Sequence, residues 1–379
     1  CLLKLEPDGT VEWQKTYGGI GDDRAESVWQ TSDGGYIAAG LTSSFGAGDY
    51  DFWILRLRPD GAVEWQKTYG GVDHDWAFSI QQTSDGGYIA AGRTKSFGSG
   101  DLDLWVLKLS PNGSIEWQKT YGGASDDEAY SVQQTGDSGY VVAGFSSSFG
   151  AGGDDFWVLK LSPDGTVDWQ KTYGGDRYEW AHSIQQTSDG GYVVAGETNS
   201  AGVGRLDAWV LKLSPDGTVE WQKTYGGVDH DRAESIQQTS DGGYIVACWT
   251  QSFGAGMDDF WVLRLRPDGS IEWQKTYGGE LYEWAYSIRQ TSDGGYIVAG
   301  ETVSFGNEAQ EIWVLKLRPD GSINPSCYSI ITLDTSISGK DSSATIKTTS
   351  ADAIDSNINP QDSSAIVQDT NVSANILCP

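Results

Sequence analysis

The sequence predicts an all-β fold made of tandem four-stranded units, and three observations support this prediction. A Trp-Gln-Lys motif recurs every 52 residues, at Trp13, Trp65, Trp117, Trp169, Trp221 and Trp273. Gly-rich turns separate short runs of aromatic and β-branched residues, which is typical of strands joined by tight turns. The 3.6-residue periodicity of helical repeats is missing. Four short antiparallel strands per unit, in tandem, indicate the blades of a β-propeller.

The fifth unit shows how the strands are assigned. Residues 233–239 alternate small, polar and apolar side chains and are expected to form the first strand. Residues 244–250, 260–265 and 270–277 are the expected second, third and fourth strands. Ser-Asp-Gly-Gly and Pro-Asp-Gly segments supply the tight turns between them, because Gly accepts a positive φ. Trp has one fixed position in the third strand and one in the fourth, and we expect both to pack between blades.

The number of blades depends on the two ends of the repeat array. First and second strands occur six times, but the third-strand motif occurs seven times, because residues 1–5 lie one period before Trp53. Residues 1–17 are therefore a half-blade, residues 18–323 are six repeats, and residues 324–333 are a degenerate strand expected to close the half-blade. The sequence thus favours a propeller of seven blades over residues 1–333, with six blades as the alternative. Pro325 stands where the last fourth-strand Trp is expected.

Residues 334–379 form a compositionally different tail, rich in Ser, Thr, Asp, Asn and Ala. A seven-residue period runs through it, at Asp334, Asp341, Thr348, Asp355, Asp362 and Asp369. The heptads lack the large apolar residues of a coiled coil. We expect either an extended β-rich stalk or strands that add to a sheet, in the same chain or in a neighbouring molecule. Donation to a neighbour would build a filament if the contact does not close.

Charge and cysteine content limit the possible partners. The formal net charge of −28 argues against nucleic acid, because phosphate binding needs basic patches. The sequence has no apolar run of 18 residues, so we expect no membrane span. Cys1, Cys327 and Cys378 lie at or beyond the ends of the repeats and are disulfide candidates whose pairing the sequence does not fix. Cysteines so placed suit an extracellular or cell-surface protein.

The repeat resembles known propeller blades, namely the tryptophan-docked blades of quinoprotein-like propellers and the Gly-Gly strand ends of kelch-type repeats. It is most similar to a secreted bacterial and archaeal repeat that reads Trp-Val-Leu-Lys-Leu, Asp-Gly and Trp-Gln-Lys-Thr-Tyr-Gly-Gly, as residues 209–227 do here. The resemblance covers roughly residues 1–323 and implies a surface protein. It implies no enzyme, because the adjacent cysteines of cofactor-binding quinoproteins are absent.

Two acidic positions are shared by all six repeats. One precedes the first strand, at Asp23 and its equivalents, and the other precedes the third-strand Trp, at Asp51 and its equivalents. Carboxylates arranged in this way could bind Ca²⁺. However, no unit has the dense Asp spacing of a calcium loop, so we expect these carboxylates to accept backbone N–H groups instead. We expect no cofactor and no resident metal.

Positions that differ between units are free to carry function. Three such positions lie at the ends of the first and second strands and are expected at one end of the propeller. The candidate binding residues among them are Arg24, Trp76, Trp180, Arg232, Trp249 and Trp284. Trp with Arg is typical of recognition surfaces, and aromatics beside carboxylates would also suit sugars. The alternative is that these residues are packing variants between blades, left by duplication.

These observations predict a non-enzymatic, extracellular structural or interaction propeller that self-assembles through its tail or binds another surface protein. A glycan-binding propeller is the alternative, and a quinoprotein-like enzyme or a hydrolase comes third. No Gly-x-Ser-x-Gly, His-Glu-x-x-His, Walker or dinucleotide-binding motif is present. The sequence therefore identifies no catalytic residue.

Overall fold

The computed structural model describes residues 1–305 and 310–323, together with six short strands between residues 331 and 369. The secondary structure of these residues consists of strands, turns and bends. None of the described segments is a helix of the length and apolar character that a membrane crossing needs. The predicted all-β class is confirmed.

Six β-propeller blades follow one another along the chain, each an antiparallel sheet in chain order. Blade 1 contains β3 (Asp23–Gln30), β4 (Tyr36–Thr42), β5 (Asp51–Leu57) and β6 (Val63–Tyr69). Blade 2 contains β7 (Asp75–Gln82), β8 (Tyr88–Thr94), β9 (Asp103–Leu109) and β10 (Ile115–Tyr121). Blade 3 contains β11 (Asp127–Gln134), β12 (Tyr140–Ser146), β13 (Asp155–Leu161) and β14 (Val167–Gly174).

The second half of the array repeats this pattern. Blade 4 contains β15 (Glu179–Gln186), β16 (Tyr192–Thr198), β17 (Asp207–Leu213) and β18 (Val219–Tyr225). Blade 5 contains β19 (Asp231–Gln238), β20 (Tyr244–Thr250), β21 (Asp259–Leu265) and β22 (Ile271–Gly278). Blade 6 has three described strands, which are β23 (Glu283–Gln290), β24 (Tyr296–Thr302) and β25 (Glu311–Leu317). The four-stranded unit predicted from the repeat is confirmed.

The preferred count of seven blades is wrong, and the alternative of six is what the structure shows. The N-terminal half-blade, β1 (Leu2–Leu5) and β2 (Val11–Gly18), contributes only a third and a fourth strand. The segment expected to complete it pairs elsewhere, because β26 (Ile331–Asp334) lies beside β22 of blade 5. The backbone edge of a complete blade offers unpaired N–H and C=O groups to such a strand, as any sheet edge does. The rest of that segment, residues 324–330, lies outside the described residues.

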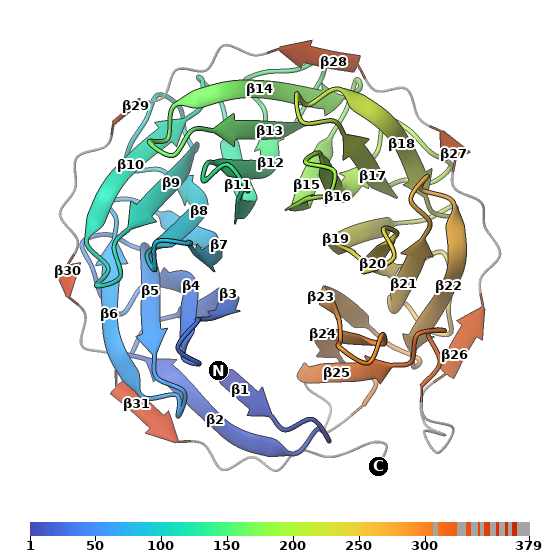
Figure 1. Ribbon diagram of the computed structural model, residues 1–379, viewed down its shortest axis with the longest axis horizontal. Coiled ribbons are helices and arrows are strands. Elements are labelled where there is room, and N and C mark those ends of the chain that lie inside the picture. The colour runs from blue at the N-terminus through green and yellow to red at the C-terminus, as the bar shows by residue number, and fades with distance from the viewer. Residues whose placement is uncertain are drawn as a thin grey trace. The chain divides into compact units, whose positions relative to one another are not determined.

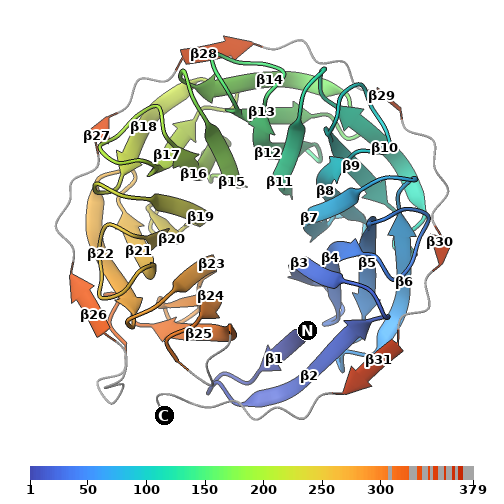
Figure 2. The ribbon, with the colours of Figure 1, turned by 180° about the vertical axis from the view of Figure 1, so that it is seen from behind.

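The described strands of the tail do not form a sheet of their own. These strands each add to the outer strand of one sheet of the same chain, and the five beyond β26 are β27 (Lys340–Asp341), β28 (Thr345–Thr348), β29 (Ile354–Asp355), β30 (Gln361–Asp362) and β31 (Ile366–Asp369). Figure 1 shows β29 beyond β10 of blade 2, and Figure 2 shows β26 beyond β22 of blade 5 from behind. Complete blades thereby become five-stranded sheets.

The chain divides into two compact units, which are described separately. Unit 1 holds residues 1–149 and 157–170 with β29–β31, and unit 2 holds residues 150–156 and 171–347. In each unit the core lies between adjacent blades. In unit 1, for example, one cluster joins Ile89 and Val106 of blade 2 to Val132, Val142 and Trp157 of blade 3. The third-strand Trp residues are buried, as expected for blade-to-blade packing.

Each described fourth strand docks on the Pro-x-Gly turn of the blade that follows it. The indole of Trp117 donates to the carbonyl of Pro163 at 3.0 Å, and the hydroxyl of Tyr121 donates to the carbonyl of Gly165 at 2.6 Å. The same Tyr-to-Gly bond recurs at 2.6 Å from Tyr17 and from Tyr225. The fixed Trp and Tyr positions of the fourth strand are therefore explained by blade docking.

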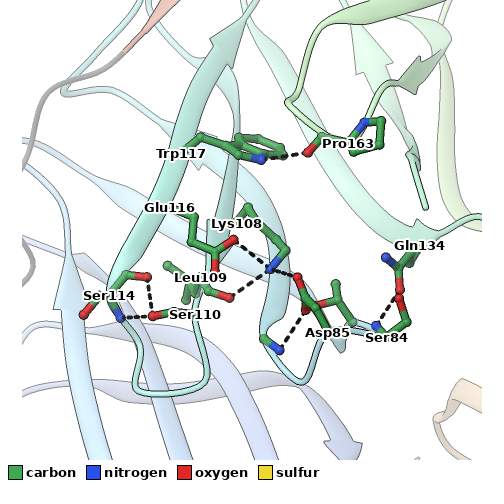
Figure 3. Close-up of polar contacts among 12 residues, drawn as sticks. Ser84, Asp85, Lys108, Leu109, Ser110, Ser114, Glu116, Trp117, Gln134 and Pro163 are labelled. Atoms are coloured by element: carbon green, nitrogen blue, oxygen red, sulfur yellow. Dashed lines mark hydrogen bonds and ion pairs between the residues drawn. The ribbon is translucent and has the colours of Figure 1, made fainter.

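Shared side chains also build the end of the blade that carries its two tight turns, which we call the turn end. Lys108 is buried there, 2.8 Å from a carboxylate oxygen of Asp85 and 3.1 Å from one of Glu116 (Figure 3). Burial opposes ionisation of Asp85, but hydrogen bonds from Lys108, Thr83 and Gly87 outweigh it and lower the pKa of Asp85 to about 2. Ion pairs therefore connect the strands and turns at the turn end, and equivalent pairs occur in other blades.

Candidate interaction surface

The opposite end of each blade, which we call the variable end, carries the positions that differ between repeats. Residues of the first strand lie directly across from residues of the second strand, in the pairs Arg24–Leu41, Trp76–Arg93, Glu128–Phe145, Trp180–Glu197, Arg232–Trp249 and Trp284–Glu301. A β-bulge follows in every first strand and leaves one residue outside the ladder, at Glu26, Phe78, Tyr130, His182, Glu234 and Tyr286. Bulges re-aim side chains. Within each blade, the three variable positions therefore lie close together at the variable end.

Two loops of neighbouring blades meet at the variable end within each unit. The backbone N–H of Asp75, at the start of blade 2, donates to the carbonyl of Tyr50 in a loop of blade 1 at 2.8 Å. In unit 2, the N–H of Met257 in blade 5 donates to the carbonyl of Leu281, which leads into blade 6, at 2.9 Å. The loop after the second strand thus supports the loop that enters the next blade.

Charged residues at the variable positions bind one another across the blade-to-blade interface. In unit 1, Arg93 of blade 2 lies 2.6 Å from Glu128 of blade 3. In unit 2, Arg232 of blade 5 lies 3.4 Å from Glu197 of blade 4. The two pairs use equivalent positions, but the charges are exchanged between the earlier and the later blade. The variable positions are therefore complementary to one another rather than independent.

The unit 1 pair lies within an aromatic cluster. The guanidinium of Arg93 sits 3.8 Å from the centre of the Trp76 ring, which is cation–π geometry. The rings of Phe78 and Tyr130 are 5.0 Å apart, and the Tyr130 hydroxyl donates to Glu128 at 3.0 Å. Burial raises the pKa of Glu128, although Arg93 and Tyr130 both stabilise its charged form. One face of Trp76 is thus already occupied.

The unit 2 pair extends into a buried polar network. Arg232 lies 2.7 Å from Glu234, and the indole of Trp249 donates to Glu234 at 3.1 Å. A guanidinium nitrogen of Arg232 is also 3.4 Å from Nδ1 of His182. Burial raises the pKa of Glu197 to about 7 against the opposing charge of Arg232, and it also raises the pKa of Glu234. Burial, and then the Arg232 charge, lower the pKa of His182.

The two remaining predicted tryptophans bind carboxylates from the preceding loop. Trp180 donates its indole N–H to Asp154 at 2.7 Å, and Trp284 donates to Asp258 at 2.6 Å. Tyr282 stacks on Trp284, with ring centres 5.5 Å apart. The sequence reasoning missed both carboxylates. The signal was available, because in each case the Asp lies 26 residues before its Trp and the other repeats lack this combination.

The six predicted binding residues therefore fall into three groups. Trp76, Trp180 and Trp284 are half-buried and packed by their neighbours. Arg232 and Trp249 belong to one network in unit 2. Arg24 is the exposed member of the set. The structure brings these residues to equivalent places in their blades, but it gives most of them partners inside the protein.

Loop tips hold most of the exposed large apolar side chains among the described residues. The described residues include eleven exposed large apolar side chains, and seven lie in these loops, namely Ile20, Val72, Tyr178, Val203, Val228, Met257 and Leu281. Single exposed apolar residues are normal, but apolar residues gathered on one surface mark interaction sites. Sequence reasoning missed them because the comparison of repeats concentrated on strand positions.

The shared acidic positions behave as expected, since their oxygens accept hydrogen bonds from loops. Asp75 accepts from the backbone N–H of Gly71 at 2.8 Å and from the hydroxyls of Ser96 and Thr94. Asp103 accepts from the N–H groups of Ser99 and Gly100. Burial raises the pKa of Asp103 to about 6. Within the described residues, no group of three or more His, Cys, Asp or Glu side chains is arranged to hold a metal ion.

Two of the four cysteines, Cys1 and Cys248, lie within the described residues. Cys1 is an exposed free thiol, whereas Cys248 is free and buried. Cys327 and Cys378 lie outside the described residues, so the predicted disulfide pairing stays a prediction.

Fold and repeat together define the chain as a β-propeller repeat protein with tandem blades. A family model described as a domain of unknown function (DUF5122) beta-propeller matches residues 31–64 and 291–326. Among solved structures, the tail fiber of Staphylococcus aureus phage P68 is similar at 11% identity, over 87% of this chain and 77% of that chain, with a TM-score of 0.30. No curated protein matches the sequence.

Proposed function

We propose that the protein is a non-enzymatic, extracellular interaction module that binds a protein partner through the loop tips of the variable end. The five exposed apolar side chains in the loops of unit 2 carry the proposal, namely Tyr178, Val203, Val228, Met257 and Leu281. Met257 and Leu281 have exposed side chains and lie on two loops that a backbone hydrogen bond joins. Apolar residues with a polar rim are typical of protein–protein interfaces.

A protein partner suits this surface better than a glycan does. Sugar binding by aromatic residues needs an open ring face, whereas Arg93 covers Trp76 and Tyr282 stacks on Trp284. Carboxylates near the tryptophans already accept indole N–H groups. The apolar side chains of the loop tips, in contrast, are exposed. A glycan remains the alternative outcome of the experiment.

The experiment compares capture by the wild-type protein and by two matched double variants. Val228→Asp/Met257→Asp places two charges on the loop tips of unit 2. Ser188→Asp/Ser240→Asp places two charges on exposed residues of the turn end in the same unit. Each protein is immobilised and exposed to surface extract and culture medium of the producing organism, and bound proteins are identified by mass spectrometry.

We expect wild type and the turn-end variant to retain the same protein partner, and the loop-tip variant to lose it. Equal capture by all three proteins, or no specific capture by wild type, would contradict the proposal. Binding on a glycan array that Trp180→Ala abolishes would support the glycan alternative instead.

A further inference from the structure

The tail strands meet the outer strands of the sheets in reverse chain order. In unit 2, β26 pairs with β22 and β27 pairs with β18. In unit 1, β29, β30 and β31 pair with β10, β6 and β2. Strand β28 belongs to the sheet of β14. Six tail strands thus occupy the six described fourth strands, one strand on each.

The register of these pairs is the same wherever it is given. The heptad Asp of the tail stands directly opposite the Lys of the Trp-Gln-Lys motif, in the pairs Lys275–Asp334, Lys223–Asp341, Lys119–Asp355, Lys67–Asp362 and Lys15–Asp369. Directly opposed residues of an antiparallel pair share one face of the sheet, and opposite charges there stabilise the pairing. A one-residue slip would remove every such pair.

The two periods of the sequence explain this constant register. Lysines recur every 52 residues along the blades, and the tail advances by seven residues from one blade edge to the next. Seven extended residues span at most about 25 Å. Every described tail strand ends at the heptad position. Each heptad therefore supplies one strand to one blade edge.

These lysines lie at the interfaces between adjacent blades. A Cβ atom added to Gly113, in the turn of blade 2, would be 2.9 Å from Cδ of Lys67 in blade 1. Gly165 of blade 3 bears the same relation to Lys119 of blade 2. Each lysine stem therefore rests on the turn of the following blade.

We propose that the outer edge of each blade is a peptide-binding site for one heptad, and that the chain's own tail fills these sites as a belt. Recognition combines backbone pairing, which accepts any extended peptide, with the Asp-to-Lys register, which favours an acidic residue at the heptad position. Five of the six heptads have Asp there, and the heptad of β28 has Thr348. Because each Lys also contacts the next blade, binding of the tail stabilises the interfaces between adjacent blades. This inference is independent of the proposed partner surface.

The chain's own tail is the occupant that the structure supports. The number of tail strands equals the number of described fourth strands, and each strand meets its edge in a strict order. Attachment to the same chain also raises the effective concentration of every heptad after the first has bound. A tail from a second copy would use the same chemistry, and the experiment separates the two sources.

Cysteine pairs in the full chain test both register and source. Thr68→Cys with Gln361→Cys, and Thr224→Cys with Lys340→Cys, replace directly opposed residues. The Cα separation of opposed strand residues falls in the range that a disulfide spans. The matched controls are Thr68→Cys with Ile354→Cys and Thr224→Cys with Leu333→Cys, because Ile354 and Leu333 occupy the neighbouring edges. Cys1, Cys327 and Cys378 are replaced by Ser throughout.

We expect the opposed pairs to form a disulfide within one chain at every protein concentration, and at least several-fold faster than the controls. Equal rates for opposed and control pairs would overturn the register. Disulfide-linked dimers whose yield rises with protein concentration would show donation to a second copy and would overturn the belt.

A charge exchange tests the recognition step separately. Lys223→Glu and Asp341→Lys should each speed hydrogen exchange of the tail peptide around residue 341 by about two- to five-fold, as expected for two opposite charges at directly opposed strand positions. The double variant should restore the wild-type rate, and Lys95→Glu, away from the tail, should leave it unchanged. Additive effects in the double variant would contradict recognition by charge.

Discussion

The two ends of each blade hold buried charge in different ways. At the turn end, Lys108, Lys160 and Lys212 each meet an Asp and a second carboxylate at equivalent positions. Lys108 also donates to the carbonyl of Leu109, and Asp85 accepts from the N–H of Gly87. At the variable end, Arg93 and Glu128 bind across the interface through side chains, and unit 2 uses the opposite order of charges.

This difference explains why one end is repeated and the other is not. Backbone groups of the turn fix which residue at the turn end is the cation and which is the anion. A side-chain pair across an interface needs only opposite charges, so either blade can supply the cation. The variable end can therefore change from blade to blade without loss of the fold, and its loops are free to acquire a partner.

The largest expected effect is the loss of a third-strand tryptophan. Trp157→Ala removes a fully buried ring from the blade 2–blade 3 core and should lower the free energy of unfolding by about 3–5 kcal/mol. Trp76→Ala, at the half-buried variable position, should cost about 1–2 kcal/mol. Denaturant unfolding of the two variants measures the difference. Equal costs would contradict the separation between shared and variable positions.

The next effect concerns the unit 2 network. Arg232→Met leaves Glu197 and Glu234 buried without their cation and should cost about 3 kcal/mol at pH 8. The cost should shrink at pH 5, because Glu197, whose pKa burial raises to about 7, is then neutral. Arg205→Met, an exposed neighbour in a loop, is the control. A cost that is independent of pH would contradict the role of buried carboxylate charge.

Stability should also depend on pH in a way that reflects both ends. Burial raises the pKa of Asp51, Asp103 and Asp259 to about 6, above the unfolded value of about 4, so stability falls as pH rises from 4 to 6. At the turn end, despite burial, hydrogen bonds from Thr187, Lys212 and Gly191 lower the pKa of Asp189 to about 2. That contribution is lost as pH falls from 4 to 2. Thermal unfolding should therefore show the highest melting temperature near pH 4–5, and a maximum at pH 7–8 would contradict this account.

The smallest expected effect is at the loop tips. Val228→Asp and Met257→Asp change exposed side chains and should alter the free energy of unfolding by less than about 0.5 kcal/mol. Circular dichroism and thermal unfolding check this directly. A larger loss would mean that these loops stabilise the blades, and the loss of partner capture would then not report on binding.

Much of the fold could be predicted from the sequence because the six repeats can be compared with one another. The 52-residue period places the strands of blade 5 within two residues of those predicted, and the shared acidic positions accept loop N–H groups as expected. The blade count was less secure. It depended on pairing residues 324–333 with the half-blade, whereas a short β-rich segment can add to any open sheet edge. The described end of that segment, in β26 (Ile331–Asp334), adds to β22.

The candidate site was only partly predictable. Alignment of the repeats identified Trp76, Arg93 and Glu128 as variable, but it did not show that Arg93 of one blade meets Glu128 of the next. Such contacts depend on how blades pack, which a single repeat does not reveal. The tail register needed the structure as well, because its seven-residue period acquires meaning only beside the lysines spaced 52 residues apart.

The most direct test of the account is a charge-exchange cycle at both ends of blade 2. We would measure unfolding free energies of Arg93→Glu, Glu128→Arg and their double variant, and of Asp85→Lys, Lys108→Asp and theirs. The account predicts that the double exchange restores most of the stability lost by each single variant at the Arg93–Glu128 pair. At the Asp85–Lys108 pair the double exchange should restore none, because the backbone groups there still require the original charges. Rescue at both ends, or at neither, would contradict the distinction between a fixed end and a variable end.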